Sequence, residues 1–274
     1  MKIFDFNIHL PQMQSPDVNE VIADDLNLSI EGLEKGLQVH ASKIKNAEGI
    51  NVLMFNQELF TAGADITPFK IGLKACFNHF LLTALVDFRK KNIIEYVATA
   101  FDQGVNAVMF NSYLQRIAES DFDAVLKVCQ YAERRNKIVC IDGSYGTSKM
   151  YTYNNMKLAC LVADHVTKVP IVIIHSGGYN VIEAMWLALD KKNVMLETSF
   201  SLDYYLGSSL ELDYGFVYKR VGSERILFGS DNPYVPFRQA CEQQLDFFQR
   251  HGFTLPDCDN IFYNNALRLI NESK

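Results

Sequence analysis

The chain has 274 residues, of which 49% are hydrophobic and 21% charged, a composition typical of soluble globular proteins. Its net charge of -6, with no run of basic residues, argues against nucleic acid or an anionic membrane as a partner. No apolar run approaches the roughly 20 residues that span a bilayer, and a strand is predicted from Lys2 onward in place of a signal peptide. The six cysteines have no close spacing, so we expect reduced thiols and a cytoplasmic protein.

Eight short apolar segments are predicted to form β-strands, at residues 2–9, 49–56, 80–87, 105–111, 137–142, 170–175, 193–199 and 225–228. Helices are predicted at 93–103, 120–136, 154–167, 179–189, 237–250 and 259–271, whereas 61–76 and 200–223 are predicted to be loops. Strands that alternate with helices predict a parallel sheet with right-handed crossovers. Together with the chain length, they predict a single (β/α)8 TIM-barrel domain over residues 1–274.

Residues 11–48 form a polar insertion between the first two predicted strands. Helices are predicted in its middle, at 18–26 and 30–44. Segments of this kind often cover the mouth of a barrel. We therefore expect the insertion to lie near the barrel mouth, as a lid or as an interface.

Nearly every predicted strand ends in a polar side chain. In chain order these residues are Asn7, His9, Asn56, Asp87, Asn111, Asp142, His175, Glu197, Ser199 and Asp231. The carboxyl ends of the strands of a TIM barrel meet on one face, where the active site is built. The pattern therefore predicts an active site formed by these side chains.

Three of these strand ends carry residue types that bind a catalytic divalent metal or perform acid/base chemistry. Asp231 follows a buried strand on a Gly-Ser turn, and Pro233 prevents the strand from continuing. His175 ends an apolar run and precedes two glycines, which indicates close approach of the backbone to a ligand. His9 lies on the first strand, two residues after Asn7.

Four segments resemble, in order, the motifs of the amidohydrolase superfamily, in its amidohydrolase-related (amidohydrolase 2) family of TIM-barrel metal-dependent hydrolases. They are Asp5-Phe-Asn7-Ile-His9, His175-Ser-Gly-Gly178, Gly229-Ser-Asp231-Asn-Pro233 and Ile261-Phe-Tyr-Asn-Asn-Ala-Leu-Arg268. The sequence departs from the family pattern at Asn7 and at Asp142, where the family has histidines. The resemblance covers the chain from its first residues to its last helix.

The resemblance implies one divalent metal ion, Zn²⁺ or Mn²⁺, with His9, His175, Asp231 and Asp142 as ligands. In such a site Asp231 and His175 are the catalytic residues, and Asp231 is the general base. Asn7 is a poor zinc ligand, while Asp142 suits a harder ion such as Mn²⁺ or Mg²⁺. A site that has lost its metal is the alternative, because some lactonases of this family need none.

The function implied is hydrolysis of a small ester, lactone or amide by water that the metal and Asp231 activate. The alternatives are a decarboxylase of a small carboxylic acid and a metal-free lactonase or binding barrel without chemistry. Candidate substrate-binding residues are Asn7, Asn111, Glu197 and Tyr145, and the loop arginines Arg116 and Arg238 could bind a substrate carboxylate. The partner expected is a small molecule, and barrels of this family often form homodimers.

Overall fold

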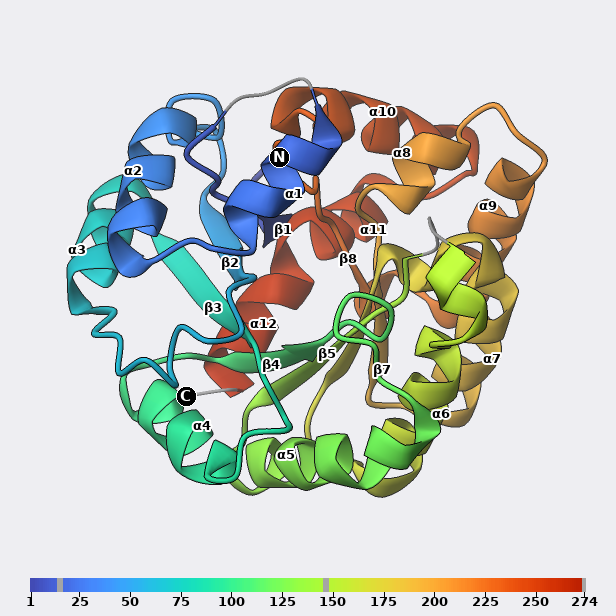
Figure 1. Cartoon of the computed structure of the whole chain (residues 1–274). Coiled ribbons are helices and arrows are strands. Elements are labelled where there is room, and N and C mark those ends of the chain that lie inside the picture. Colours follow the sequence, from blue (N-terminus) through green and yellow to red (C-terminus); the bar gives the residue numbers. More distant parts are fainter. Residues whose placement is uncertain (14–16, 145–147, 273–274) are drawn as a thin grey trace.

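Eight parallel strands follow one another in sequence order around a barrel in the computed structural model, which describes residues 1–13, 17–144 and 148–272 (Figure 1). The strands are β1 (Phe4–Ile8), β2 (Gly49–Met54), β3 (His79–Leu85), β4 (Ala107–Phe110), β5 (Ile138–Asp142), β6 (Ile171–Ile174), β7 (Val194–Glu197) and β8 (Ile226–Leu227). Between β1 and the segment that follows β8, the Phe6 amide donates to the Phe228 carbonyl at 2.9 Å, and Ile8 pairs with Asn232. These contacts close the sheet, and the predicted TIM barrel with its eight strands is confirmed.

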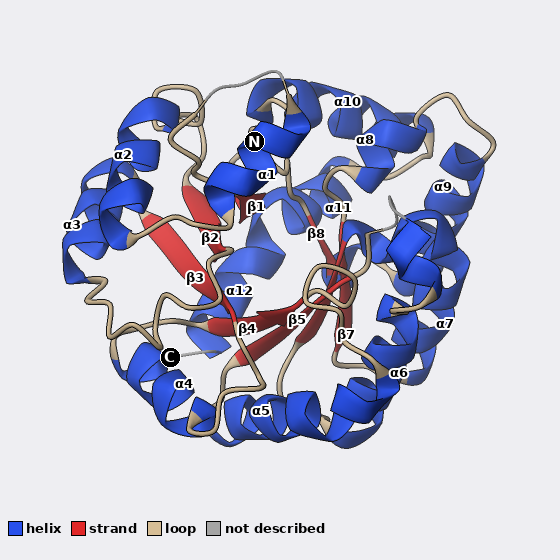
Figure 2. Ribbon diagram, in the orientation of Figure 1, coloured by secondary structure: helices blue, strands red, loops and turns tan. Residues whose placement is uncertain are grey.

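Helices surround the strands (Figure 2). They are α1 (Val18–Asp25), α2 (Ile30–His40), α3 (Thr67–Cys76), α4 (Ile93–Asp102), α5 (Phe122–Arg134), α6 (Asn155–His165), α7 (Val181–Asp190), α8 (Ser201–Tyr205), α9 (Leu210–Val221), α10 (Phe237–Arg250), α11 (Leu255–Asp259) and α12 (Asn265–Glu272). A 3₁₀ segment, His175–Asn180, follows β6 directly. The insertion between β1 and β2 contributes α1 and α2.

The apolar side chains form two layers because successive strand residues face opposite sides of the sheet. In β5, Ile138 and Cys140 belong to the cluster that fills the barrel, while Val139 and Ile141 belong to the layer between strands and helices. Helix α12 packs against β1, β3 and β8 and adds Leu269 to the inner cluster. Side chains therefore fill the interior of the barrel, and α12 covers one of its ends.

Two predicted loops are helices, so those predictions were wrong. Within 61–76, α3 begins at Thr67 with a proline in its first turn, where the missing N–H costs nothing. Within 200–223, the buried residues Tyr214, Val217 and Tyr218 recur at the helical period in α9. Gly215 lies within α9 and permits close packing, because a Cβ there would lie 2.0 Å from Nδ1 of His251.

Strand β1 contains an irregularity that affects the site. Asp5 lies opposite Ile50 of β2 and Ile8 lies opposite Val52, so three steps on β1 correspond to two on β2. An extra residue of this kind changes the face to which the following side chains point. Asn7 and His9 therefore do not continue the alternation that begins at Phe4.

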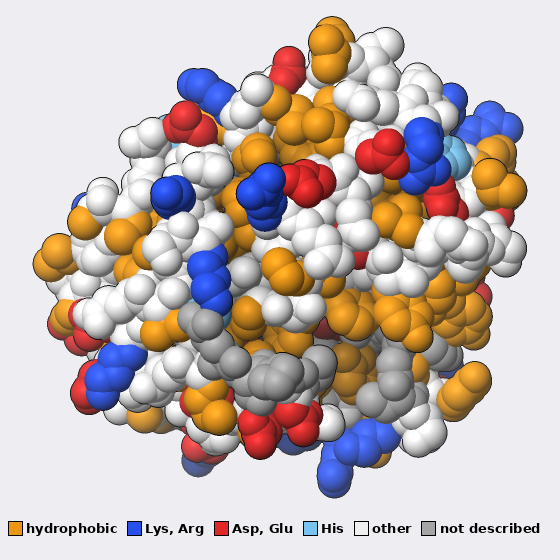
Figure 3. Space-filling model, turned by 90° about the horizontal axis from the view of Figure 1, so that it is seen from above, with side chains coloured by type: hydrophobic (Ala, Val, Ile, Leu, Met, Phe, Trp, Pro, Cys, Tyr) orange, Lys and Arg blue, Asp and Glu red, His pale blue; other side chains and the backbone are white. Residues whose placement is uncertain are grey.

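The face seen from above shows hydrophobic side chains interspersed with charged side chains of both signs (Figure 3). Basic side chains on this face stand singly or in small groups. Among the described helices, none combines the length and apolar character needed to cross a membrane. All six cysteines are free, and Cys129, Cys140 and Cys258 are buried.

Candidate active site

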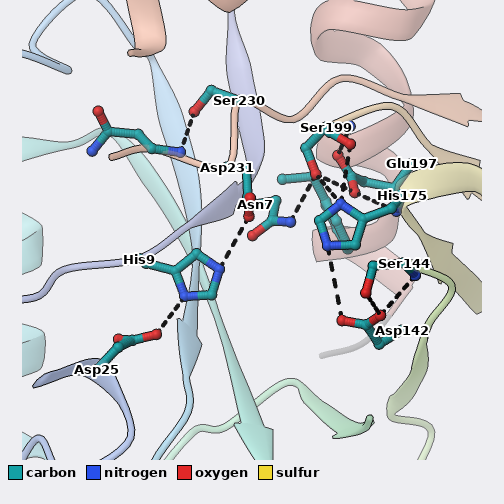
Figure 4. Close-up of polar contacts among 12 residues, drawn as sticks. Asn7, His9, Asp25, Asp142, Ser144, His175, Glu197, Ser199, Ser230 and Asp231 are labelled. Carbon is teal, nitrogen blue, oxygen red and sulfur yellow. Dashed lines mark hydrogen bonds and ion pairs between the residues drawn. The ribbon is translucent and has the colours of Figure 1, made fainter. Parts of the chain in front are cut away.

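The polar strand ends surround a cavity of about 160 Å³ at the carboxyl end of the barrel. It is lined by His9, Ile22, Phe55, Asn111, Tyr113, Leu114, Asp142, Ser144, His175, Phe200, Asp231 and Tyr234. Five of the predicted strand-end residues, from β1, β4, β5, β6 and β8, therefore share one cavity. Its polar side chains form two groups, one around each histidine (Figure 4).

The His9 group consists of Asp25, His9 and Asp231. The Nδ1 atom of His9 lies 2.7 Å from Oδ2 of Asp25, and its Nε2 atom lies 3.2 Å from Oδ1 of Asp231. Asp25 comes from α1 of the insertion and is 1% exposed. The imidazole is thus held between two buried carboxylates from opposite ends of the chain.

The His175 group consists of Asp142, His175, Glu197 and Ser199. The hydroxyl of Ser199 donates to Oε2 of Glu197 at 2.8 Å, so it has no proton left for His175. The Nδ1 atom of His175 lies 3.0 Å from the Ser199 carbonyl oxygen and must therefore be the donor. The Nε2 atom is 3.8 Å from Oδ2 of Asp142, too far for a hydrogen bond, and so remains available to a ligand.

Asp142 is held by its own neighbours. Its Oδ1 accepts from the Ser144 amide at 2.8 Å and from the Ser144 hydroxyl at 2.5 Å, and its Oδ2 accepts from the Asn111 amide group at 2.9 Å. The Tyr113 hydroxyl lies 2.9 Å from the oxygen of Ser144. Asn111, predicted to bind substrate, thus lines the cavity and also orients Asp142.

Asn7 lies between the two groups (Figure 4). Its amide nitrogen donates to the Ser199 hydroxyl at 2.8 Å, while its buried Oδ1 has no hydrogen-bond partner among the described residues. Glu197 is fully buried and accepts from the amides of His175 and Ser199. Both residues were predicted to contact substrate, and the structure places them beneath the cavity rather than on its wall. Tyr145, the fourth predicted contact, lies outside the described residues.

The backbone is strained where it presents the key side chains. His175, Phe200 and Asp231 all have positive φ angles, of 61°, 54° and 64°, which non-glycine residues rarely adopt. Strain of this kind persists where surrounding contacts impose it, and it clusters at functional sites. At Asp231 those contacts include Asp5, which accepts from the amide of the preceding Ser230 at 2.9 Å and from its hydroxyl.

Gly229 is also required by packing at this turn. A Cβ at this position would lie 1.9 Å from Oε1 of Glu197. The β8 motif therefore carries a glycine because the carboxylate that supports His175 passes directly against it.

The electrostatics of the cavity favour charged histidines and an ionised Asp231. Burial would lower the pKa of His9, but the charges of Asp25 and Asp231 and their hydrogen bonds outweigh burial and raise it to about 10. Burial would also lower the pKa of His175, but the charges of Asp231, Asp142 and Glu197 outweigh burial and raise it. For Asp231, burial raises the pKa, but the hydrogen bond from His9 and the charge of His175 bring it below the ordinary value.

The donor chemistry of the cavity fits a divalent ion. Both imidazoles have Nδ1 engaged and Nε2 facing carboxylates, as metal-ligating histidines do. Within the described ranges, however, no three His, Cys, Asp or Glu side chains are grouped closely enough to hold an ion as they lie. Among the candidate ligands, His9 faces Asp231 and His175 faces Asp142 instead.

Sequence reasoning missed Asp25 and most of the cavity wall. Asp25 lies in a helix of the insertion, where nothing distinguishes it from the neighbouring Asp24. The wall residues Phe55, Phe200 and Tyr234 follow strand ends, but apolar residues at such positions read as ordinary core. Arg116 and Arg238 are exposed, and Arg238 pairs with Glu242 at 2.7 Å, so neither is on the cavity wall.

A family model described as Amidohydrolase matches residues 95–271. No protein with a curated description matches the chain. The barrel is similar to that of an uncharacterised TIM-barrel protein from Bordetella bronchiseptica, with a TM-score of 0.73, 17% identity and coverage of 100% of this chain and 99% of that chain.

Two further solved structures have chemical descriptions. A probable 2-pyrone-4,6-dicarboxylic acid hydrolase from Acinetobacter baumannii, with citric acid bound, has a TM-score of 0.60 and 15% identity over 99% of this chain and 100% of that chain. A dihydroxybenzoic acid decarboxylase from Polaromonas sp., with bound manganese and an inhibitor, has a TM-score of 0.66 and 13% identity over 100% and 98%. At these identities the similarity shows the fold alone. The family match, which spans more than half of the chain and includes both His175 and Asp231, shows that this protein belongs to the amidohydrolase-2 family, whose members include hydrolases and decarboxylases.

Proposed function

We propose that the protein is a hydrolase of a small ester, lactone or amide, in which Asp231 is the base that activates water. One observation carries this proposal: an ionised carboxylate, held by His9, shares a small cavity with an unoccupied Nε2 donor on His175. A base and a hydrogen-bond donor on the same cavity are what addition of water to a carbonyl group requires.

In this reaction Asp231 accepts a proton from a water molecule while the water oxygen forms a bond to the carbonyl carbon. Negative charge then develops on the carbonyl oxygen, and the Nε2–H of His175 is the donor that stabilises it. The bond from carbon to the leaving oxygen or nitrogen breaks, and the leaving group takes the proton from Asp231. The products are a carboxylic acid and an alcohol or amine. His9 and Asp25 hold Asp231 in place throughout.

A divalent ion would be held by Nε2 of His9 and of His175 and by the carboxylates of Asp142 and Asp231. An ion bound there would supply a lower pKa for water in the cavity. Because this set contains two carboxylates beside two imidazoles, the site suits Mn²⁺ better than Zn²⁺.

The test is turnover of phenyl acetate and of the lactone dihydrocoumarin, together with the metal content of the purified protein. Both substrates are offered to the protein as purified, after chelation, and after reloading with Mn²⁺ or Zn²⁺. We expect Asp231→Asn to lower kcat/KM by about 10²–10⁴-fold, because it removes the general base. The matched control is Asp203→Asn, a buried carboxylate outside the cavity wall, which should leave kcat/KM unchanged. Equal rates for wild type and Asp231→Asn would refute the proposal.

Decarboxylation is the second candidate, supported by the similarity of the fold to decarboxylases that include the manganese-bound structure. Release of CO₂ from dihydroxybenzoic acids by the Mn²⁺-loaded protein, without hydrolysis of either ester or lactone, would favour it. A protein with neither activity would be left as a binding barrel.

A further inference from the structure

One part of the cavity wall is apolar and largely aromatic. Phe55, Tyr113, Leu114, Phe200 and Tyr234 line it, and all five are half-buried, so each turns part of its surface toward the cavity. The volume of about 160 Å³ is close to that of cavities that admit one benzene-sized ring. The size and the wall therefore suit one flat six-membered ring.

The aromatic rings also define how such a ring would approach. The ring of His9 meets Phe55 edge-on at 4.8 Å between centroids and Tyr234 at 5.3 Å, and the ring of His175 meets Phe200 at 6.2 Å. These contacts keep each imidazole edge, with its Nε2 atom, directed toward a carboxylate. A ligand ring packed on the aromatic wall would then place a substituent carbonyl near Asp231 and His175.

The charges around the cavity oppose an anionic ligand. Three carboxylates, Asp25, Asp142 and Asp231, form ion pairs with two imidazoles, at 2.7, 3.8 and 3.2 Å. A carboxylate therefore lies beside the Nε2 atom of each imidazole. A ligand carboxylate would approach these three carboxylates.

No lysine or arginine is present among the described residues that line the cavity. The short stretches outside the described ranges near the insertion and after β5, residues 14–16 and 145–147, contain no lysine or arginine in the sequence. The side chain best suited to bind a carboxylate, arginine, is thus missing from the lining.

From the aromatic wall and from the lining without lysine or arginine among the described residues, we infer that the substrate of this site carries no negative charge. It is a flat ring of about six members that contains or bears an ester, lactone or amide carbonyl. This inference rests on the proposed hydrolase function for the reaction, but the binding preference it states can be measured without turnover. It also separates this barrel from enzymes whose substrates are carboxylic acids.

Binding is tested with two ketones that cannot be hydrolysed, acetophenone and 4-acetylbenzoate, which differ only by a carboxylate. Titration of the full chain followed by ligand NMR should give a Kd for 4-acetylbenzoate at least about tenfold higher, because the added charge faces carboxylates and no lysine or arginine among the described lining residues. Phe200→Ala should weaken acetophenone binding. Equal or tighter binding of 4-acetylbenzoate would overturn the inference.

A charge introduced into the wall provides the reciprocal test. Leu114→Arg should shrink or reverse the preference between the two ketones, while Leu114→Gln, which is polar but uncharged, should preserve it. An unchanged preference in a folded Leu114→Arg protein would contradict the electrostatic argument.

Hydrolysis rates of two esters test this inference separately from the proposed function. Phenyl acetate should be hydrolysed with a kcat/KM at least about tenfold higher than 4-acetoxybenzoate. If neither ester is hydrolysed but acetophenone still binds selectively, the hydrolase proposal fails and the inference about ligand charge holds. If both are hydrolysed equally through Asp231, the hydrolase proposal holds and the inference fails.

Discussion

The two histidine groups hold their imidazoles in different ways. His9 is held by side-chain carboxylates alone, one from α1 and one from the turn after β8. His175 is held by the backbone carbonyl of Ser199, and its own amide is bound by Glu197. The first arrangement depends on charge and on a distant insertion, whereas the second is built into adjacent strands. Substitution of a partner of His9 should therefore lower activity, whereas substitution of a partner of His175 should mainly lower the stability of the fold.

The largest effect is expected at Asp203, a buried carboxylate with no cationic partner among the described residues. Asp203, in α8 behind the His175 group, accepts from the Gln244 amide at 2.7 Å, and burial raises its pKa to about 7. The folded protein keeps a proton that the unfolded chain loses near pH 4, so the free energy of unfolding should fall between about pH 4 and pH 7. Asp203→Asn should remove up to about 4 kcal/mol of this fall.

Urea unfolding at several pH values measures the effect. The exposed Asp123→Asn is the control and should keep the slope of the wild type. A fall of the same size in Asp203→Asn would show that this carboxylate is already ionised in the folded protein.

Glu197→Gln should disrupt the His175 group and lower the stability of the fold. Glu197 accepts from two backbone amides and one hydroxyl, and a buried amide NH₂ in place of one carboxylate oxygen would face donors. We expect the free energy of unfolding to drop by about 2–3 kcal/mol. Chemical denaturation measures it, and a loss below about 0.5 kcal/mol would mean that the network rearranges at little cost.

Asp25→Asn should disrupt the His9 group and lower activity. The amide oxygen can still accept from Nδ1 of His9, but the imidazole loses the charge of one carboxylate. We expect kcat/KM to fall about 10–100-fold, as for other residues that orient a catalytic histidine. The neighbouring, less buried Asp24→Asn is the matched control and should behave as wild type. Equal activity in the two variants would show that Asp25 is not needed to position His9.

Ser199→Ala should have the smallest effect. It removes the hydroxyl that joins Asn7 to Glu197 but leaves the backbone carbonyl that holds His175. We expect a loss of about 1 kcal/mol in unfolding free energy and a nearly unchanged kcat/KM. A large fall in kcat/KM with little loss of stability would show that His175 depends on the hydroxyl rather than on the backbone.

Local sequence patterns were sufficient for the barrel and for five of the twelve residues that line the cavity. Short apolar runs that end in Asn111, Asp142, His175 and Asp231 mark strands, and the geometry of a parallel barrel brings such ends to one face. Two helices, α3 and α9, were not predicted from the sequence, because glycines and a proline inside them resemble loop signals.

The partners of these residues depended on packing between distant parts of the chain. Asp25 reaches His9 because the insertion folds back over the barrel, and the irregularity in β1 redirects Asn7 toward Ser199. Whether Glu197 faces a ligand or supports His175 likewise depends on how β6 and β7 pair. A window of neighbouring residues records the period of a strand or helix, but it contains no information about which charge from another element will lie beside a given side chain.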